Sequence, residues 1–562
     1  MKIRKNTKPI HTGCFVFLIF SLLYLWGCST TVQGGDAGEF ITVAFSGGRV
    51  HPPGYPATVF LMQLAQMLPS GTAAWKASAV AAVLGALALG FMANGIHRWL
   101  GDGVVAIATV LCLGLGPLWL RYATIAEVFT SSALTLSMLF WLGVHVYNGL
   151  RGWRVGCLLG AIVALGIQFH HTFIFALPIM LFIVWQGSLG KIGWVCVLLM
   201  PMLGLFGYLP LLAAKGFWVW GDFHSFNGLI RFFLREEYGT FQITHGEGGA
   251  SWWGNPLLYL SLLPSDLLYL PIAFIPVGLY ALRKDPFGLC IFVAWVFCGV
   301  VFLSLFSLPA EGAAAIHTQR FMVAPTVLLL PIVAKGVQFF SLRWLGFAPL
   351  LLSGFHLFEI PYKFDLRMEN YLHNTCSVLP DDSILFVEGD GMFFGFLYAQ
   401  NVLGICQQVT PISTKMLTHS WYREKIEYFD PGVNLSTPTD VGLLQSHFGK
   451  RPMFSAISYA SKHGHRFPPA VPYAGVVMKF VSQLPTPQRV EENLSNKMKD
   501  FRFSHLENDF LRTRSSEYWV NEQYGLSWKG LANVYVANGL DDQAQKADLI
   551  SQRFFAMTPY LD

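Results

Sequence analysis

The chain has 562 residues, of which 53% are hydrophobic and 13% are charged, and its formal net charge is +5. Soluble globular domains contain about 25% charged residues, so this composition excludes an ordinary water-soluble enzyme and indicates a membrane protein. The small positive charge is not gathered into a stripe, which argues against nucleic acid as a partner. Nine cysteines without a CxxC pair or a Cys/His cluster argue against a structural zinc site.

About eleven apolar segments are predicted to cross the membrane, because one span needs about 20 apolar residues. The first follows Lys2, Arg4, Lys5 and Lys8 and runs from Cys14 to Cys28. We interpret it as a retained span, because Trp26 does not suit a lipoprotein cleavage box. The other ten are Ala73–Ile96, Val104–Leu120, Val128–Tyr147, Val155–Phe169, Thr172–Trp185, Ile192–Ala213, Leu257–Leu282, Phe287–Phe306, Phe321–Ala334 and Trp344–Ile360.

The basic residues of the loops orient these spans. A cytoplasmic N-terminus places most of them on the cytoplasmic side, as the positive-inside rule requires. The short outer loops then hold chiefly Arg49, Arg121 and Arg320. An odd number of spans leaves everything after Ile360 outside, which fits a multi-pass protein of a bacterial inner membrane with an extracytoplasmic C-terminal domain.

Acidic and histidine residues collect on the same outer side in this topology. Ionisable groups at membrane level are costly and usually functional, so their convergence predicts a catalytic or binding chamber at the outer interface. The residues concerned are Asp36, Glu39, His51, Glu127, His170, His171, Asp222, Glu236, Glu237, His317 and Arg320.

We expect two parts: a multi-span core over residues 1–360 and a soluble α/β and helical domain over residues 361–562. In the second part, Ser383–Glu388 and Gln408–Ile412 are predicted strands flanking a helix over Met392–Leu403, a βαβ-like unit. Cys376 and Cys406 could pair in an oxidising compartment. The spacing of Trp528, Leu531, Ala532, Tyr535, Gly539 and Ala544 suits one tetratricopeptide-type helical hairpin, although an accidental amphipathic helix pair explains it nearly as well.

Two neighbouring motifs carry the strongest chemical signal: Gly34-Gly35-Asp36-Ala37-Gly38-Glu39-Phe40 and His51-Pro52-Pro53-Gly54-Tyr55-Pro56. If the first is helical, Asp36 and Glu39 share a helix face, and partial desolvation at a membrane interface makes a carboxylate a better base. The prolines and the glycine of the second favour a rigid turn that fixes His51. A polar loop with turn residues is an equally good interpretation.

These two motifs, at this spacing after a first span, closely resemble the transmembrane-protein-260-like O-mannosyltransferase family in its bacterial form. Further segments resemble the same family in the same order. They are Ala126–Phe129, Gly166–Thr172, Tyr208–Leu211, Trp220–Asp222, Arg235–Gly239, Glu388–Asp390, Tyr398, Gln400 and Trp421-Tyr422. The resemblance departs from the usual pattern at Phe129, where tyrosine is common, and at Glu236-Glu237.

The resemblance implies a C-superfamily glycosyltransferase: a mostly α, polytopic membrane protein with a catalytic Asp in its first outer loop. Such enzymes take a sugar, here mannose or another hexose, from a polyprenyl-phosphate carrier and need no cofactor. An acceptor hydroxyl requires a base, for which we expect Asp36 with Glu39 as helper. The departing phosphate requires cations or donors, for which we expect Arg320, His51, His170 and His171. Glu127, Asp222 and Glu237 are further loop or acceptor candidates.

Each candidate has a simpler explanation. The two histidines suit a membrane interface, Arg320 could extend to lipid headgroups, Glu127 could pair with Arg121, and Asp222 could cap a loop helix. A metal site is not expected, because no tight ligand spacing is present.

Three functions remain open at this stage. The first is transfer to a protein Ser/Thr hydroxyl, the second is transfer to a lipid or an envelope glycan, and the third is transport. Transport is disfavoured because the charges lie at span ends and no internal repeat is visible.

Overall fold

The computed structural model of the protein describes residues 8–221, 223–239, 251–306, 308–339, 363, 365–463, 468–503 and 518–556. The predicted span Trp344–Ile360 lies outside the described residues. The chain forms two compact units, the first made of Met1–Thr30, Val50–Ala214 and Phe223–Lys363, and the second of Thr31–Arg49, Lys215–Asp222 and Phe364–Asp562. The segment that carries Asp36 and Glu39 therefore folds with the C-terminal part of the chain.

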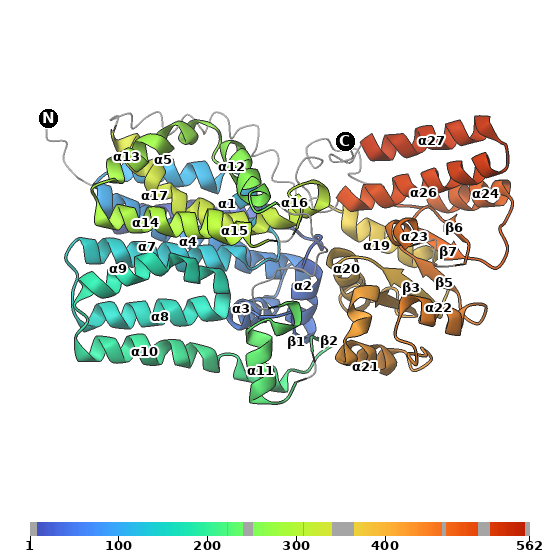
Figure 1. The fold of residues 1–562 in the computed structure, drawn as a ribbon, viewed down its shortest axis with the longest axis horizontal. Coiled ribbons are helices and arrows are strands. Elements are labelled where there is room, and N and C mark those ends of the chain that lie inside the picture. Colours follow the sequence, from blue (N-terminus) through green and yellow to red (C-terminus); the bar gives the residue numbers. More distant parts are fainter. Residues whose placement is uncertain are drawn as a thin grey trace. The chain divides into compact units, whose positions relative to one another are not determined.

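The first unit is helical (Figure 1). Its described elements are α1 (Pro9–Gly27), α3 (Pro56–Gln66), α4 (Ala73–Leu100), α5 (Gly103–Gly114), α6 (Pro117–Thr124), α7 (Phe129–Tyr147), α8 (Trp153–Phe169), η1 (His171–Ala176), α9 (Leu177–Gly187), α10 (Gly190–Phe206), η2 (Leu209–Ala213), α11 (Phe226–Phe233), η3 (Glu236–Tyr238), α12 (Gly254–Asp266), η4 (Leu270–Phe274), α13 (Ile275–Leu282), α14 (Pro286–Val296), η5 (Phe297–Val301), α15 (Phe302–Ser304), α16 (Gly312–Gln319), η6 (Arg320–Met322) and α17 (Val323–Phe339).

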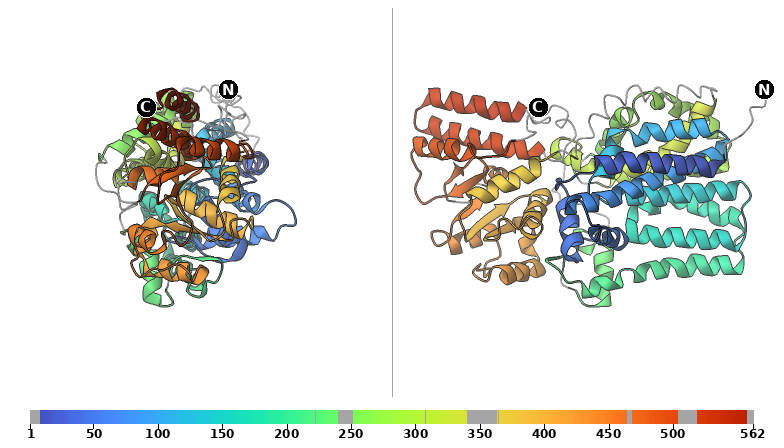
Figure 2. Two further views of the ribbon diagram at one scale, coloured as in Figure 1. Left: turned by 90° about the vertical axis from the view of Figure 1, so that its right-hand side faces the viewer. Right: turned by 180° about the vertical axis from the view of Figure 1, so that it is seen from behind.

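Small residues bring the long helices of this unit into close contact. A Cβ on Gly13 of α1 would lie 2.8 Å from the carbonyl oxygen of Gly90 in α4. A Cβ on Gly156 of α8 would lie 2.3 Å from the carbonyl oxygen of Gly193 in α10. Apolar side chains gain no hydrophobic free energy by moving from lipid to a helix interface. Membrane helices therefore associate through close packing of their backbones. Helices α8, α9 and α10 accordingly lie side by side in Figures 1 and 2.

Among the described residues, six helices are long and apolar enough to span a membrane, and up to eight spans result if each bent pair of helices counts as one. These helices make the chain an integral, multi-pass membrane protein. Helix α10 shows the lipid-facing surface most clearly, because Leu198 and Leu203 are 64% and 62% exposed. The count of about eleven spans stays a prediction.

Two segments predicted as single spans are bent in the structure. Val104–Leu120 divides into α5 and α6, which meet at 72°, and Leu257–Leu282 divides at 114° into α12 and the η4–α13 segment. The two breaks touch, because a Cβ on Gly116 would lie 2.0 Å from the carbonyl oxygen of Asp266. Pro117 begins α6 and Pro271 lies in the first turn of η4, where a missing backbone N–H costs nothing. Hydropathy averages across such breaks and cannot detect them.

The second unit combines helices with a five-stranded sheet. Its described elements are α2 (Ala37–Ser46), β1 (Gly48–Arg49), β2 (Trp218–Val219), α19 (Arg367–Val378), β3 (Ser383–Val387), α20 (Asp390–Asn401), β4 (Val409–Ser413), η9 (Thr414–Thr418), α21 (Ser420–Phe429), α22 (Asp440–His447), β5 (Met453–Ser455), α23 (Ile457–His463), β6 (Ala470–Tyr473), β7 (Val477–Phe480), α24 (Pro487–Met498), α26 (Tyr518–Ala537) and α27 (Asp541–Ala556).

The sheet has the order β4-β3-β5-β7-β6. Strands β3 and β4 are parallel, with Ile384 opposite Thr410, and α20 connects them. The βαβ-like unit predicted from the sequence is therefore present. Every residue of β3 is buried, as expected for a central strand covered on both faces. Cys376 and Cys406 form a disulfide, with their Cα atoms 5.1 Å apart.

Helices α26 and α27 form the predicted helical hairpin, drawn in red in Figure 1. Leu531 and Tyr535 of α26 are buried with Ala544 of α27 against Val471 of β6 and Leu494 of α24. A single hairpin cannot bury its own apolar face, and here β6 and α24 cover it. Its relation to tetratricopeptide repeats stays a prediction.

Candidate functional site

Asp36 and Glu39 lie at the start of helix α2. Asp36 is the residue before the first turn, and its carbonyl oxygen accepts the backbone N–H of Phe40. Asp36 is 7% exposed, and Glu39 in the first turn is completely buried. The segment is therefore helical, which the sequence left open, and both carboxylates lie at one helix end. Carboxylates are favoured at helix N-termini, where unpaired backbone N–H groups carry partial positive charge.

Trp218 holds Glu39 in place. Its indole N–H donates a 2.9 Å hydrogen bond to Glu39 Oε1, although the two residues are 179 positions apart. Trp218 is 1% exposed, so this bond is screened from water. A hydrogen bond to a charged group in such surroundings is worth about 1.5–3 kcal/mol. Trp218 therefore fixes the Glu39 carboxylate.

Glycines allow α2 to dock on α20. A Cβ on Gly38 would lie 2.5 Å from the carbonyl oxygen of Phe394, and one on Gly391 would lie 3.0 Å from the backbone nitrogen of Gly35. No larger residue fits at Gly38 unless the backbone shifts. The glycines of the first motif thus serve the packing that positions Asp36.

Arg49 ties the end of the segment at residues 31–49 to the segment at residues 215–221. Strand β1 pairs in parallel with β2, Gly48 opposite Trp218. The Arg49 guanidinium, 2% exposed, donates from Nε to the Trp220 carbonyl oxygen at 2.5 Å and from an Nη atom to that of Gly221 at 2.6 Å. An arginine that the orientation rule placed in a short outer loop is therefore a buried structural residue.

Aromatic rings surround Trp218 and Trp220. The Trp218 ring lies 5.4 Å from Phe393 and 5.8 Å from Trp421, and the Trp220 ring lies 5.2 Å from Trp421. These contacts join the segment at residues 215–221 to α20 and α21. Trp218 also lines a cavity of about 320 Å³ with Lys425, whose pKa is lowered by burial and by the nearby Arg49 charge.

The second motif forms a turn that packs inside the first unit. Gly54 has φ +90°, and a Cβ there would lie 2.8 Å from the Phe232 ring and 3.0 Å from Leu211. Tyr55 precedes α3 with φ 43°, and Pro56 opens that helix. Both the backbone conformation and the close approach of α11 thus require glycine at position 54.

His51, Tyr55 and His170 form a contact series. The Tyr55 hydroxyl and His51 Nε2 are 3.4 Å apart, and the Tyr55 ring stacks on His170 with centroids separated by 5.4 Å. His170 is 7% exposed, and its Nδ1 accepts the backbone N–H of Thr172. Because Nδ1 accepts, the neutral ring carries its proton on Nε2, and that N–H can donate to a ligand.

Arg320 lies on the same cluster. Its guanidinium carbon is 5.9 Å from the Phe129 ring centroid and 5.4 Å from that of Phe321. Both rings also contact His170, at 5.5 Å and 6.3 Å. His170 lies within electrostatic range of His51, His171, Arg235 and Arg320. The sequence-predicted donors His51, His170, His171 and Arg320 therefore gather with Arg235 into one donor cluster in the first unit.

The other candidate residues from the sequence analysis lie in several different parts of the chain. His171 packs on the Phe233 ring at 4.4 Å. Glu127 is 3% exposed just before α7, and Glu237 lies in η3. The neighbouring Glu236 forms an exposed ion pair with Arg231. Asp222 lies outside the described residues.

Sequence reasoning missed Tyr55, Arg235 and Trp218 as individual site residues. Tyr55 lies inside the second motif and Arg235 at the start of a family-like segment. Trp218 forms a Trp-x-Trp pattern with Trp220, which is unusual in a polar loop. Only the fold shows that this indole meets Glu39.

Comparisons with known proteins agree with this architecture. The crystal structure of ArnT from Cupriavidus metallidurans in the apo state superposes with a TM-score of 0.54 over 84% of this chain and 98% of that chain, at 13% identity. This likeness shows that the chain shares the fold of that protein, and the described part of the chain is mostly helical.

The sequence comparisons identify more specific relatives than the structural comparison does. Residues 36–190 match the family "Protein O-mannosyl-transferase TMEM260 N-terminal domain". Protein O-mannosyl-transferase tmem260 of Dictyostelium discoideum is 26% identical over 75% of this chain and 59% of its own length. The Mus musculus protein is 24% identical over 75% of this chain and 65% of its own length. The chain therefore spans about three-fifths of the length of these curated relatives, to which it is similar in sequence.

Proposed function

We propose that this protein is a membrane glycosyltransferase that moves mannose or another hexose from a polyprenyl-phosphate carrier to a protein Ser/Thr hydroxyl. The similarity to proteins named protein O-mannosyl-transferase and the C-superfamily fold support the class. The observation that carries the proposal is the buried carboxylate pair Asp36 and Glu39 at the start of α2, inside the region that matches the family.

In the proposed reaction, the acceptor oxygen attacks C1 of the sugar. The bond from C1 to the phosphate oxygen breaks, and its electron pair leaves with the carrier phosphate. The hydroxyl proton passes to the Asp36 carboxylate, since an alcohol is a poor nucleophile until a base removes its proton. Glu39, fixed by Trp218, orients the acceptor. No metal is required in this scheme.

The donor cluster of the first unit is proposed to bind the carrier phosphate. Arg320 offers a planar guanidinium suited to two phosphate oxygens, and His170 offers an Nε2–H donor. The phosphate already carries negative charge before transfer and gains more in the transition state. Donors and cations fixed in advance therefore stabilise the leaving group.

We further propose that the second unit faces the extracytoplasmic side. The positive-inside pattern of the loops supports this orientation. So does the disulfide Cys376–Cys406, because disulfides persist in oxidising compartments and are rare in the cytosol.

The test is transfer by purified protein in liposomes, with polyprenyl-phosphate-mannose and a Ser/Thr-containing peptide as substrates. Asp36→Asn removes the base without changing side-chain size, and we expect the rate to fall by about 10²–10⁴-fold with an unchanged melting curve. Asp542→Asn, at an exposed position in the first turn of α27, is the matched control and should retain full activity. Full activity of Asp36→Asn would remove this residue from the mechanism.

The acceptor class is tested separately. Mass spectrometry of envelope glycoproteins and glycolipids, with and without the protein, should show a hexose lost from Ser/Thr of a protein. Loss from a lipid or an envelope glycan alone would overturn the protein acceptor and keep the transferase.

A further inference from the structure

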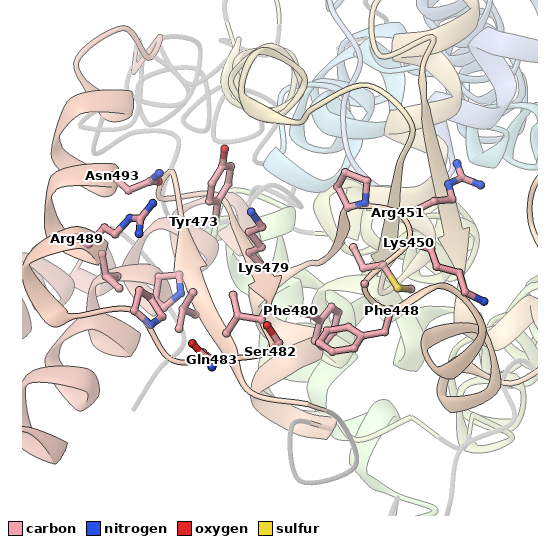
Figure 3. A pocket seen from close by; sticks show the side chains of 18 residues that line it. Phe448, Lys450, Arg451, Tyr473, Lys479, Phe480, Ser482, Gln483, Arg489 and Asn493 are labelled. Atoms are coloured by element: carbon pink, nitrogen blue, oxygen red, sulfur yellow. The ribbon is translucent and has the colours of Figure 1, made fainter.

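The second unit contains a large cavity that has no role in the proposed reaction. Its volume is about 710 Å³, and it lies beside β6 and β7, between α24 and the turn that precedes β5. The lining includes Phe448, Lys450, Arg451, Val471, Tyr473, Lys479, Phe480, Ser482, Gln483, Arg489 and Asn493 (Figure 3). Binding sites for ligands and short segments commonly fall in the range of about 300–1,000 Å³.

The charged residues of this cavity all have one sign. Four cations, Lys450, Arg451, Lys479 and Arg489, contribute to the lining, and the lining that the structure describes contains no carboxylate. Arg451 is already neutralised by Asp430 at 2.7 Å and by Asp382 at 2.8 Å. Three cations therefore remain to attract an anionic ligand.

None of these three is used by the fold as an ion-pair partner within the described residues. Lys450 donates to the Ser446 carbonyl oxygen, and Lys479 Nζ lies 5.6 Å from the Tyr473 ring centroid. The nearby acid Glu491, on the same helix as Arg489, accepts a hydrogen bond from the Tyr535 hydroxyl. A positive potential in a concave site raises the local concentration of anions.

The charges are spread along the cavity rather than focused on one point. Figure 3 shows Lys450 near one end and Arg489 near the other, with Lys479 and Tyr473 between them. Buried apolar side chains, including Val471 and Phe480, form the wall among the cations. One phosphate group would need donors that converge, whereas separated single cations above an apolar wall suit separated carboxylates on an extended chain.

We propose that this cavity binds an acidic polypeptide segment of the acceptor. The proposal rests on the proposed function, because it names a feature of the same reaction's substrate. Carboxylates of the segment contact Lys450, Lys479 and Arg489, and its apolar side chains lie on Phe480 and Val471. The cavity selects acceptors by charge and does not take part in the chemical step.

Binding is measured without transfer, on full-length purified Asp36→Asn protein in nanodiscs. The probe is a fluorescein-labelled decapeptide of alternating Ser and Glu, compared with one in which Gln replaces Glu. We expect the Glu peptide to bind at least about tenfold more tightly, in a salt-dependent manner. The double variant Lys479→Met/Arg489→Gln should lose that preference.

The matched control is Lys497→Gln/Lys546→Gln, which removes two exposed cations of the same unit that lie outside the cavity. It should change binding by less than about twofold. Equal loss in both double variants, or equal binding of both peptides, would overturn the proposal, and so would full competition by inorganic phosphate at the peptide's own concentration. If the peptide binds but wild-type protein transfers no sugar, the proposed function fails alone. If sugar is transferred but the Glu peptide does not bind preferentially, only this inference fails.

Discussion

The packing of α2 on α20 predicts that alanine at position 38 destabilises the protein, and the sign of this change in stability can be measured. In an unconstrained helix, Gly→Ala is stabilising by about 1 kcal/mol, because alanine loses less backbone entropy. At Gly38 the new Cβ would lie 2.5 Å from the Phe394 carbonyl oxygen and 2.7 Å from its carbon. Ordinary contact begins near 3.4 Å, so α2 must retreat by about 0.9 Å. Overpacking of this kind costs about 1–3 kcal/mol, and more when backbone must move.

We therefore expect Gly38→Ala to destabilise the second unit by up to about 2 kcal/mol net, since the overpacking cost exceeds the gain from alanine. It should also lower sugar transfer by at least about tenfold, because the shift displaces Asp36 and lengthens the bond from Trp218 to Glu39. Thermal unfolding followed by tryptophan fluorescence gives the first quantity, and the liposome assay gives the second. The control is Gly254→Ala in α12, where the nearest atom to the new Cβ is Ala310 Cβ at 3.3 Å, and which should change stability little. A Gly38→Ala protein more stable than wild type by about 1 kcal/mol would refute the docking of α2.

Three further outcomes are expected. Arg320→Lys keeps the charge but loses the planar donor pair, so the KM for the lipid-linked donor should rise by about tenfold with a smaller change in kcat; an unchanged KM would contradict phosphate binding. Burial alone would raise the pKa of Asp430, but Arg451 and neighbouring donors hold it below its ordinary value. The stability that this carboxylate contributes should therefore be present above about pH 4 and lost as the pH falls further, so wild type and Asp430→Asn should converge in melting temperature at low pH. Replacing Cys376 and Cys406 with alanine opens a loop with a sequence separation of 30 and should lower the free energy of unfolding by about 3–4 kcal/mol. The variant should melt at a lower temperature than wild type, and reducing agent should not lower its melting temperature further.

Local properties of the sequence determined the class of protein. Hydropathy identified the membrane helices, because each span must be apolar over its own length whatever its neighbours are. Alternation and turn residues identified β3, α20 and β4, because a buried strand with a glycine turn is written in consecutive residues. The two motifs left open whether Asp36 and Glu39 share a helix face and whether His51 lies in a rigid turn; the structure has helix α2 at the first motif and a turn before α3 at the second.

The tertiary structure decided which residues surround those carboxylates. Trp218 reaches Glu39 across 179 positions, and Gly38 faces the backbone of Phe394. The breaks after α5 and α12 arise where two chain segments touch at Gly116. Such contacts join distant segments through shape and hydrogen-bond geometry, whereas hydropathy and spacing describe only neighbours along the chain. For that reason the composition gave the membrane class, and folding alone brought the partners of the site together.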